Sequence, residues 1–389
     1  MFLPALLWRD YGVWSFAAFA LPNIVGAAAM GLVMRSPRAS SVFLERHRWA
    51  CFAFSAVTVA FQVFFAAWVA RVMGGGFWHA GWLLCVAALL LSRGGPSMLR
   101  TATLVGLAVW VVSVATLATT VARESGAGML PEVVEWTGVL PGHHLVPLAM
   151  VCLLGFGLCP YLDRTFHRAR IEAGTRAVRV FGIGFGFLFA VMIAGTLLTA
   201  PLLVWIVGAT GGAGGQAVGR LLVALFAAHT LPQLVYTVWV HGCETRGNAE
   251  RIGLAAVGLI VGLAVVLAGA GPLVRQYGWD IGWANPLFGG EVVYRGFMAF
   301  YGLVFPAYVA VVAWPMGDGG RVVARRNILI LGAVLLVAGW FYWAGFVERH
   351  TWWVAGGVAV VVLGSIVACV VAKPARATGG LHDNGLPGT

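Results

Sequence analysis

Polar side chains stand at the centre of several long apolar segments in this chain of 389 residues. Asn23 lies in the middle of the first segment and Gln62 in the middle of the second. His229 and Gln233 lie one helical turn apart in the seventh segment. An amide or imidazole in an apolar environment needs a hydrogen-bonding partner, and inside a membrane such residues mark binding sites or ion pathways. We predict that these four residues form one polar set at the middle of the bilayer. The alternative is that they only hydrogen-bond neighbouring helices together.

Prolines interrupt four apolar segments that run in the same direction, at Pro22, Pro160, Pro232 and Pro306. Each proline leaves the carbonyl four residues earlier without its helical hydrogen bond. In transporters, such broken helices bind substrates and cations near the bilayer midplane, whereas the alternative is an ordinary kink. We therefore predict several proline-broken helices and a site that includes the backbone around two of the breaks. The predicted site residues at these breaks are Leu21, Pro22, Asn23, Gly26, Gly157 and Pro160.

Asp163 ends the fifth segment and is the carboxylate nearest to the membrane interior on that side. It is predicted to bind a cation or relay a proton, or to pair with Arg164 or a neighbouring loop arginine. Two groups could instead serve a membrane-embedded enzyme: Asp163 with His167, or His143 and His144 with Glu135. Two adjacent histidines without a third ligand are weak evidence for a metal, and the six cysteines are dispersed without a CxxC pair. We expect neither a metal site nor disulfides.

The segments ALPNIVGAAAMG (20–31) and GFGLCPYLDRTFHR (155–168) resemble the amino acid–polyamine–cation transporter superfamily, and within it the sodium/solute symporters. Proteins of this superfamily break their first and sixth core helices around substrate and sodium. The resemblance implies that the backbone of residues 21–26 and 155–160 lines the transport site.

The elements that must position these residues are apolar helices. The chain is 60% hydrophobic and only 10% charged, with a mean hydropathy of +0.89, which is too apolar for a soluble domain. We predict an all-α polytopic bundle of about eleven membrane helices, because each segment can cross roughly 30 Å of hydrocarbon. The predicted segments are 11–34, 49–72, 77–93, 98–121, 145–163, 180–206, 218–241, 252–270, 293–314, 327–347 and 352–372. One transmembrane domain is expected to fill residues 1–372, followed by a disordered cytoplasmic tail at 373–389.

Positive charge is divided unevenly between the two sides of the predicted bundle. One side holds seven of the 25 basic residues, namely Arg9, Arg71, Arg123, Arg220, Arg275, Arg295 and Arg349. Seven of the 14 acidic residues balance them, so the whole formal charge of +11 lies on the other side. The positive-inside rule makes that side cytoplasmic. The protein is then expected in the inner cell membrane, with its N-terminus outside and its C-terminus in the cytoplasm. The high isoelectric point therefore indicates membrane topology and not nucleic-acid binding. The arginine-rich loops, such as 164–179, are expected to contact anionic lipids.

These observations favour a secondary transporter or permease for a small solute, with a midplane site between the first, fifth and seventh segments. We expect no bound cofactor, and Na⁺ or H⁺ as the coupling ion. His229, which titrates near neutral pH when it is unperturbed, would make such transport pH-dependent if it contacts Asn23. A membrane-embedded enzyme and a noncatalytic subunit or scaffold are the alternatives.

Overall fold

A computed structural model describes residues 2–73, 76–92, 98–124, 135–197, 216–244, 262–263, 291–316 and 325–372, and all regular structure within them is helical. Within these residues, seven helical stretches are long and apolar enough to cross a membrane. They are Trp14–Val33, Arg48–Trp68, Gly142–Leu162, Arg164–Leu197, Val293–Ala313, Arg325–Val347 and Trp352–Val371. The predicted helical bundle is thus confirmed for the described residues, whereas the count of eleven spans stays a prediction. Most of the predicted segment 252–270 and the whole of the tail 373–389 lie outside the described residues.

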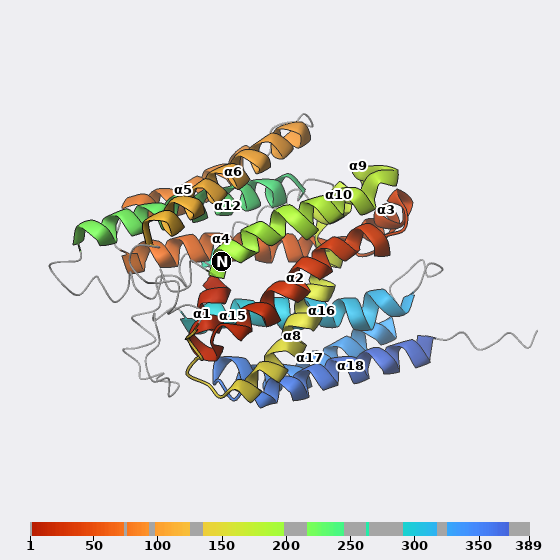
Figure 1. Cartoon of the computed structure of the whole chain (residues 1–389). Coiled ribbons are helices and arrows are strands. Elements are labelled where there is room, and N and C mark those ends of the chain that lie inside the picture. Colours follow the sequence, from red (N-terminus) through yellow and green to blue (C-terminus); the bar gives the residue numbers. More distant parts are fainter. Residues whose placement is uncertain are drawn as a thin grey trace, which may run out of the picture.

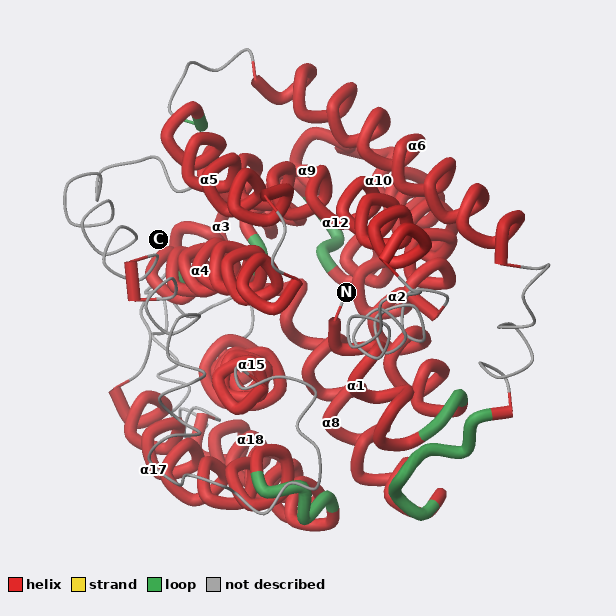
Figure 2. The backbone as a smooth tube through the Cα atoms, turned by 90° about the vertical axis from the view of Figure 1, so that its left-hand side faces the viewer, coloured by secondary structure: helices red, strands yellow, loops and turns green. Residues whose placement is uncertain are grey.

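The long helices lie side by side and form three neighbouring groups (Figures 1 and 2). One group packs α4 (Arg48–Met73), α5 (Gly76–Leu91) and α6 (Met98–Glu124) around α12 (Gln216–Glu244). In the middle, α2 (Trp14–Val33) packs along α8 (Leu145–Leu158) and α10 (Ala177–Phe181). The third group contains α17 (Arg325–Tyr342) and α18 (Trp352–Ala372). A chain segment that starts with α15 (Glu291–Ala299) contacts α8 and α17, and it continues through η5 (Phe300–Val304), α16 (Phe305–Tyr308) and η6 (Val309–Ala313).

Two short helices appear where the sequence predicted no regular structure. The first, α1 (Phe2–Tyr11), is almost fully buried, and Ala5, Leu6 and Leu7 are each at most 3% exposed. The second, α3 (Pro37–Arg46), begins with Ser36, whose side chain accepts a hydrogen bond from the amide of Ala39. Ten residues are too few to cross a bilayer, so an apolar helix of this length gives no membrane signal.

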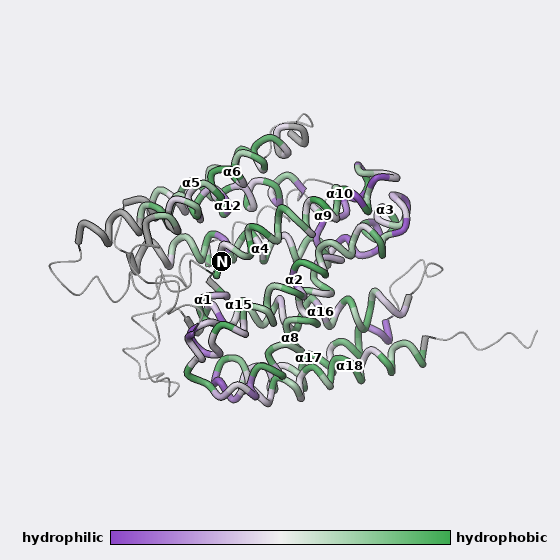
Figure 3. Tube along the Cα trace, in the orientation of Figure 1, coloured by the Kyte–Doolittle hydropathy of each residue, from purple (hydrophilic) through white to green (hydrophobic). Residues whose placement is uncertain are grey.

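Hydrophilic residues gather at the two ends of the bundle (Figure 3). We call one end the arginine end, because it carries α3 and α9 (Arg164–Ala173) with their arginines. The opposite end is the Asp10 end, where α1 and the starts of α8 and α15 meet. Within 164–179, Arg170 is only 4% exposed and donates hydrogen bonds to the carbonyls of Met34 and Gly174. Arg170 therefore holds the end of α2, and the expected lipid contact does not apply to it.

The prediction of several proline-broken helices is largely wrong. Both α2 and α12 continue through Pro22 and Pro232, since a helix can pass a proline as a kink when its surroundings tolerate the lost hydrogen bond. Only Pro160 ends a helix: α8 stops at Leu158 and a 3₁₀ turn, η2 (Cys159–Leu162), contains the proline. Pro306 lies between the two π-helical turns η5 and η6.

Two of the carbonyls that lose a helical hydrogen bond because of these prolines have identified neighbours. The hydroxyl of Tyr342 on α17 donates a hydrogen bond of 2.7 Å to the carbonyl of Gly302, four residues before Pro306. The carbonyl of Phe156, four residues before Pro160, lies against Gly26 of α2. Because Gly26 has no side chain, α8 can approach α2 until the two backbones touch, as small residues allow between membrane helices.

We expect Gly26→Ala to destabilise the protein by about 1–3 kcal/mol, because its Cβ would overlap the carbonyl oxygen of Phe156 and force the two backbones apart. The apparent melting temperature in detergent measures the effect. Gly157→Ala on α8 is the matched control, since a Cβ there meets nothing within 4 Å. Equal melting temperatures for the two variants would contradict the close packing of α2 on α8.

Candidate functional site

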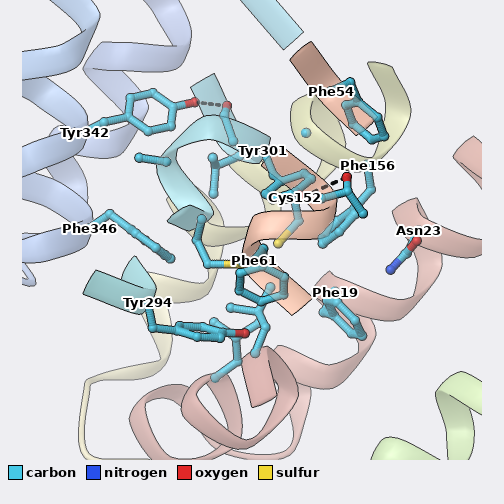
Figure 4. A pocket seen from close by; sticks show the side chains of 18 of the residues that line it. Phe19, Asn23, Phe54, Phe61, Cys152, Phe156, Tyr294, Tyr301, Tyr342 and Phe346 are labelled. Atoms are coloured by element: carbon cyan, nitrogen blue, oxygen red, sulfur yellow. Dashed lines mark hydrogen bonds between the residues drawn. The ribbon is translucent and has the colours of Figure 1, made fainter. Parts of the chain in front are cut away.

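A cavity of about 350 Å³ lies in the middle of the bundle, between α1, α2, α4, α8, α12 and the segment from α15 to η5. Its wall combines hydrogen-bonding side chains with aromatic rings. The polar lining residues are Asn23, Thr58, Gln62, Asp163, Thr237, His241, Tyr294, Tyr301 and Tyr342, and the phenylalanines are Phe19, Phe54, Phe61, Phe156 and Phe346. Figure 4 shows Cys152, Phe61 and Tyr301 around the middle, with Phe346 and Tyr342 on one side and Asn23 on the other. We call this space the central cavity.

A second cavity of about 250 Å³ adjoins the central cavity, with which it shares Phe19, Asn23, Phe61, Gln62 and Thr237. Gln233 of α12 also lines this second cavity. Three of the four residues of the predicted polar set, Asn23, Gln62 and Gln233, therefore surround one space although they come from three helices. Asn23 and Gln62 stand at the boundary between the two cavities.

The fourth residue of that set, His229, does not reach either cavity. It is 2% exposed and faces α6, where its Nδ1 lies 3.4 Å from the carbonyl of Ser113. The Ser113 hydroxyl donates back to the carbonyl of His229, and the Gln233 amide donates to that hydroxyl at 2.9 Å. His229 therefore joins two helices and is not a partner of Asn23, which corrects the expected contact between them.

The predicted site residues at the proline breaks divide into two groups. On α2, Leu21 is 63% exposed on the outside of the bundle, and only Asn23 of this stretch lines the cavity. Pro22 continues the helix and Gly26 is buried against α8. On α8, Gly155 and Phe156 line the central cavity, whereas Gly157 of α8 and Pro160 of η2 are not among its lining residues.

Asp163 lies at the end of the cavity nearest the arginine end. One carboxylate oxygen, Oδ1, accepts hydrogen bonds from the amide and the hydroxyl of Thr165 and so caps α9. The other oxygen, Oδ2, lies 3.9 Å from Nε2 of His241, which is 5% exposed. Nδ1 of His241 is 3.3 Å from the hydroxyl of Ser55 on α4. A buried carboxylate, an imidazole and a hydroxyl thus lie in a row at this end of the cavity.

At the opposite end, Asp10 of α1 gathers three arginines. It is 1% exposed and its carboxylate lies 2.7 Å from Arg9, 2.7 Å from Arg295 and 3.0 Å from Arg349. Arg295 also donates to the carbonyl of Phe346, which lines the cavity. The group, which we call the Asp10 cluster, ties α1 to α15 and to the turn that follows η8 (Trp343–Val347).

These contacts determine the protonation state of Asp10. Burial acts to raise the pKa of Asp10, but Arg295, together with Arg9 and Arg349, outweighs burial and holds this pKa below its ordinary value of 3.8. Asp10 is therefore ionised at neutral pH. Arg349 adopts a φ of +67°, a conformation that few residues other than glycine take.

Among the described residues, no side-chain hydrogen bond or ion pair joins the members of either group expected of an enzyme. His167 turns away from Asp163: its Nε2 lies 2.8 Å from the carbonyl of Tyr161 and its ring stacks on Phe43. His143 and His144 lie next to each other, and His143 stacks on Trp352. No group of three or more metal-ligating side chains occurs among the described residues.

Sequence reasoning missed His241, Thr58 and Tyr301, although the spacing of the polar residues contains a signal. Ser55, Thr58 and Gln62 recur at intervals of three and four residues on α4 and share one helical face. Gln233, Thr237 and His241 do the same at intervals of four on α12, which packs against α4. Two polar stripes in apolar helices thus mark the cavity wall.

Comparison with protein-family models, with curated proteins and with solved structures finds no match for this chain. Its function therefore has to be inferred from the cavity and the groups around it.

Proposed function

We propose that this chain is a secondary transporter or permease for a small solute, which binds in the central cavity. The observation that supports this proposal is the central cavity. It has the size of a small-molecule site, and it lies midway along helices that are apolar enough to span a membrane. A bundle that served only as a scaffold would be expected to fill this space with side chains.

The lining favours a small solute with an apolar or aromatic part and a few hydrogen-bonding groups. Phe61, Phe156 and Phe346 offer rings for stacking, and the amides of Asn23 and Gln62 supply donors and acceptors. Asp163 is the one carboxylate among the described lining residues, and it lies at the far end of the cavity. The proposal therefore places the solute between the aromatic rings and the two amides.

The proposed coupling ion is a proton held by Asp163 and His241. Asp163 has the imidazole of His241 as an ionisable neighbour, and no ion pair joins it to an arginine in the described part of the chain. The oxygens of Asp163 contact the amide and the hydroxyl of Thr165 and the imidazole of His241. We therefore propose that Asp163 and His241 together hold the proton, which needs no shell of oxygen ligands. A sodium ion would require about six oxygen ligands, as hard cations do.

The alternative of a membrane enzyme draws on the line of Ser55, His241 and Asp163, which contains the residue types of a hydrolase triad. Ser55, however, is fully buried and does not line the cavity, so its hydroxyl cannot reach a solute there. Ser55 is better suited to hold the ring of His241. The resemblance to sodium/solute symporters stays a prediction, and the continuity of α2 at Pro22 gives it no support.

A binding screen tests the proposal. We expect at least one member of a panel of aromatic amino acids, nucleobases and small amides to raise the melting temperature of the purified protein. The Asn23→Leu variant should lose that shift, because leucine removes the amide from the cavity wall. Leu21→Ala is the matched control: it lies two residues away on the same helix, points outward and should keep the shift. An equal loss in both variants, or no stabilising solute in the panel, would contradict a solute site at Asn23.

A further inference from the structure

A third cavity lies apart from the proposed transport site, at the arginine end. It has a volume of about 710 Å³ and is bounded by the end of α2, by α3 and by the end of η6. Arg35, Arg38 and Arg46 stand on its wall, and none of the described residues that line it is acidic. We call this space the arginine cavity.

Positive charge in the arginine cavity comes from its guanidinium groups. Arg35 and Arg38 are exposed, and neither forms an ion pair with a carboxylate of the described residues. Burial, with Arg46 and His167 nearby, lowers the pKa of His47 to about 4, so its imidazole is neutral at pH 7. The ten-residue helix α3 also points its N-terminus, the positive end of its dipole, toward this space at Ser36.

The floor of the cavity is apolar. Met34, Phe43 and Val309 line its inner part, and Trp314, which is 61% exposed, lies at its edge. The apolar spans Trp14–Val33 and Val293–Ala313 both end here, so the cavity lies at the level where hydrocarbon gives way to headgroups. An exposed tryptophan is typical of that level.

We propose that the arginine cavity binds the phosphate headgroup of an anionic membrane lipid, with the first part of an acyl chain on the apolar floor. Guanidinium groups match phosphate oxygens in charge and geometry, which accounts for the arginines. A soluble phosphate would use the arginines but leave the apolar floor unoccupied. The floor therefore favours the lipid as the occupant.

Native mass spectrometry of the purified full chain tests the lipid site, with phosphatidylglycerol as the probe and phosphatidylcholine as the neutral comparison. We expect one tightly retained phosphatidylglycerol per chain, which an excess of inorganic phosphate does not displace. Arg35→Ala with Arg38→Ala should weaken this binding about 30-fold, the factor expected from two arginines near a membrane surface.

Arg325→Ala with Arg326→Ala is the matched control, because it removes the same charge from exposed residues at the same end that do not line the cavity. The control should retain the lipid. Equal weakening in both double variants would show only a general charge effect, and displacement by inorganic phosphate would show a soluble anion as the ligand. Either outcome would overturn the proposal.

Discussion

Replacing Asp10 by alanine is expected to cost about 3–5 kcal/mol of stability, the largest effect that we expect from a single substitution. The change leaves Arg9, Arg295 and Arg349 in the Asp10 cluster without the carboxylate that compensates them, and Arg295 is only 3% exposed. A buried charge that loses its partner typically costs this much. Unfolding in detergent, followed by the apparent melting temperature, measures the loss.

Glu348→Gln provides the control for the Asp10 variant. Glu348 is an acid at the same end of the bundle, but its exposed carboxylate accepts one hydrogen bond, from Trp343. Its loss should change stability by less than about 0.5 kcal/mol. A melting temperature for Asp10→Ala that equals that of Glu348→Gln would show that the Asp10 cluster does not stabilise the bundle.

The same cluster predicts acid sensitivity, and the direction follows from the lowered pKa of Asp10. A carboxylate with a depressed pKa contributes its full stability above its ordinary value of 3.8 and loses it as the pH falls through the lower folded pKa. The native protein should therefore lose stability below about pH 4 more steeply than Asp10→Ala does. Parallel curves for the two proteins between pH 3 and 6 would contradict this assignment.

The second large effect is expected at Asp163, where asparagine should reduce proton-driven solute accumulation at least tenfold and leave solute binding intact. Asparagine keeps the shape of the side chain and is a good helix N-cap, so the hydrogen bond from the amide of Thr165 to the side chain can persist. It cannot carry the negative charge that faces His241. Uptake into proteoliposomes under an imposed pH gradient, with a solute from the binding screen, measures the change.

His229→Gln is the control for Asp163→Asn, because His229 faces Ser113 and lies outside both cavities. It should accumulate solute like the native protein. Accumulation driven by a sodium gradient at constant pH would contradict the proton as the coupling ion while leaving the solute site in place. Loss of solute binding in Asp163→Asn would place Asp163 in the solute site itself.

Long apolar helices and their polar centres could be predicted from the sequence. The predicted segments 145–163 and 352–372 match the observed α8 with η2, and α18, to within one residue at each end. Asn23 and Gln62 were found because a polar side chain in the middle of an apolar run has no other explanation than a partner or a cavity.

The wrong predictions have a common physical origin. Which helices are neighbours depends on packing, and a single sequence does not show that packing. His229 was expected to meet Asn23, but α6 supplies Ser113 on its side of α12. The burial of Asp10 could not be predicted from the sequence, since two of its three arginine partners lie 285 and 339 positions away. Pro22 and Pro232 were expected to break their helices, whereas α2 and α12 continue through both prolines.

Cysteine accessibility tests most directly whether the central cavity is a transport site. Cys152 lies midway along α8 and lines the cavity, so it serves as a native probe when the other five cysteines are replaced. A membrane-impermeant thiol reagent should label Cys152 from outside intact cells and also in inside-out vesicles, because a transport site opens to each side in turn. A protein that retains only Cys85, which is buried in the apolar core and outside both cavities, should stay unlabelled. Labelling of Cys152 from neither side, or from one side only, would contradict transport through this cavity.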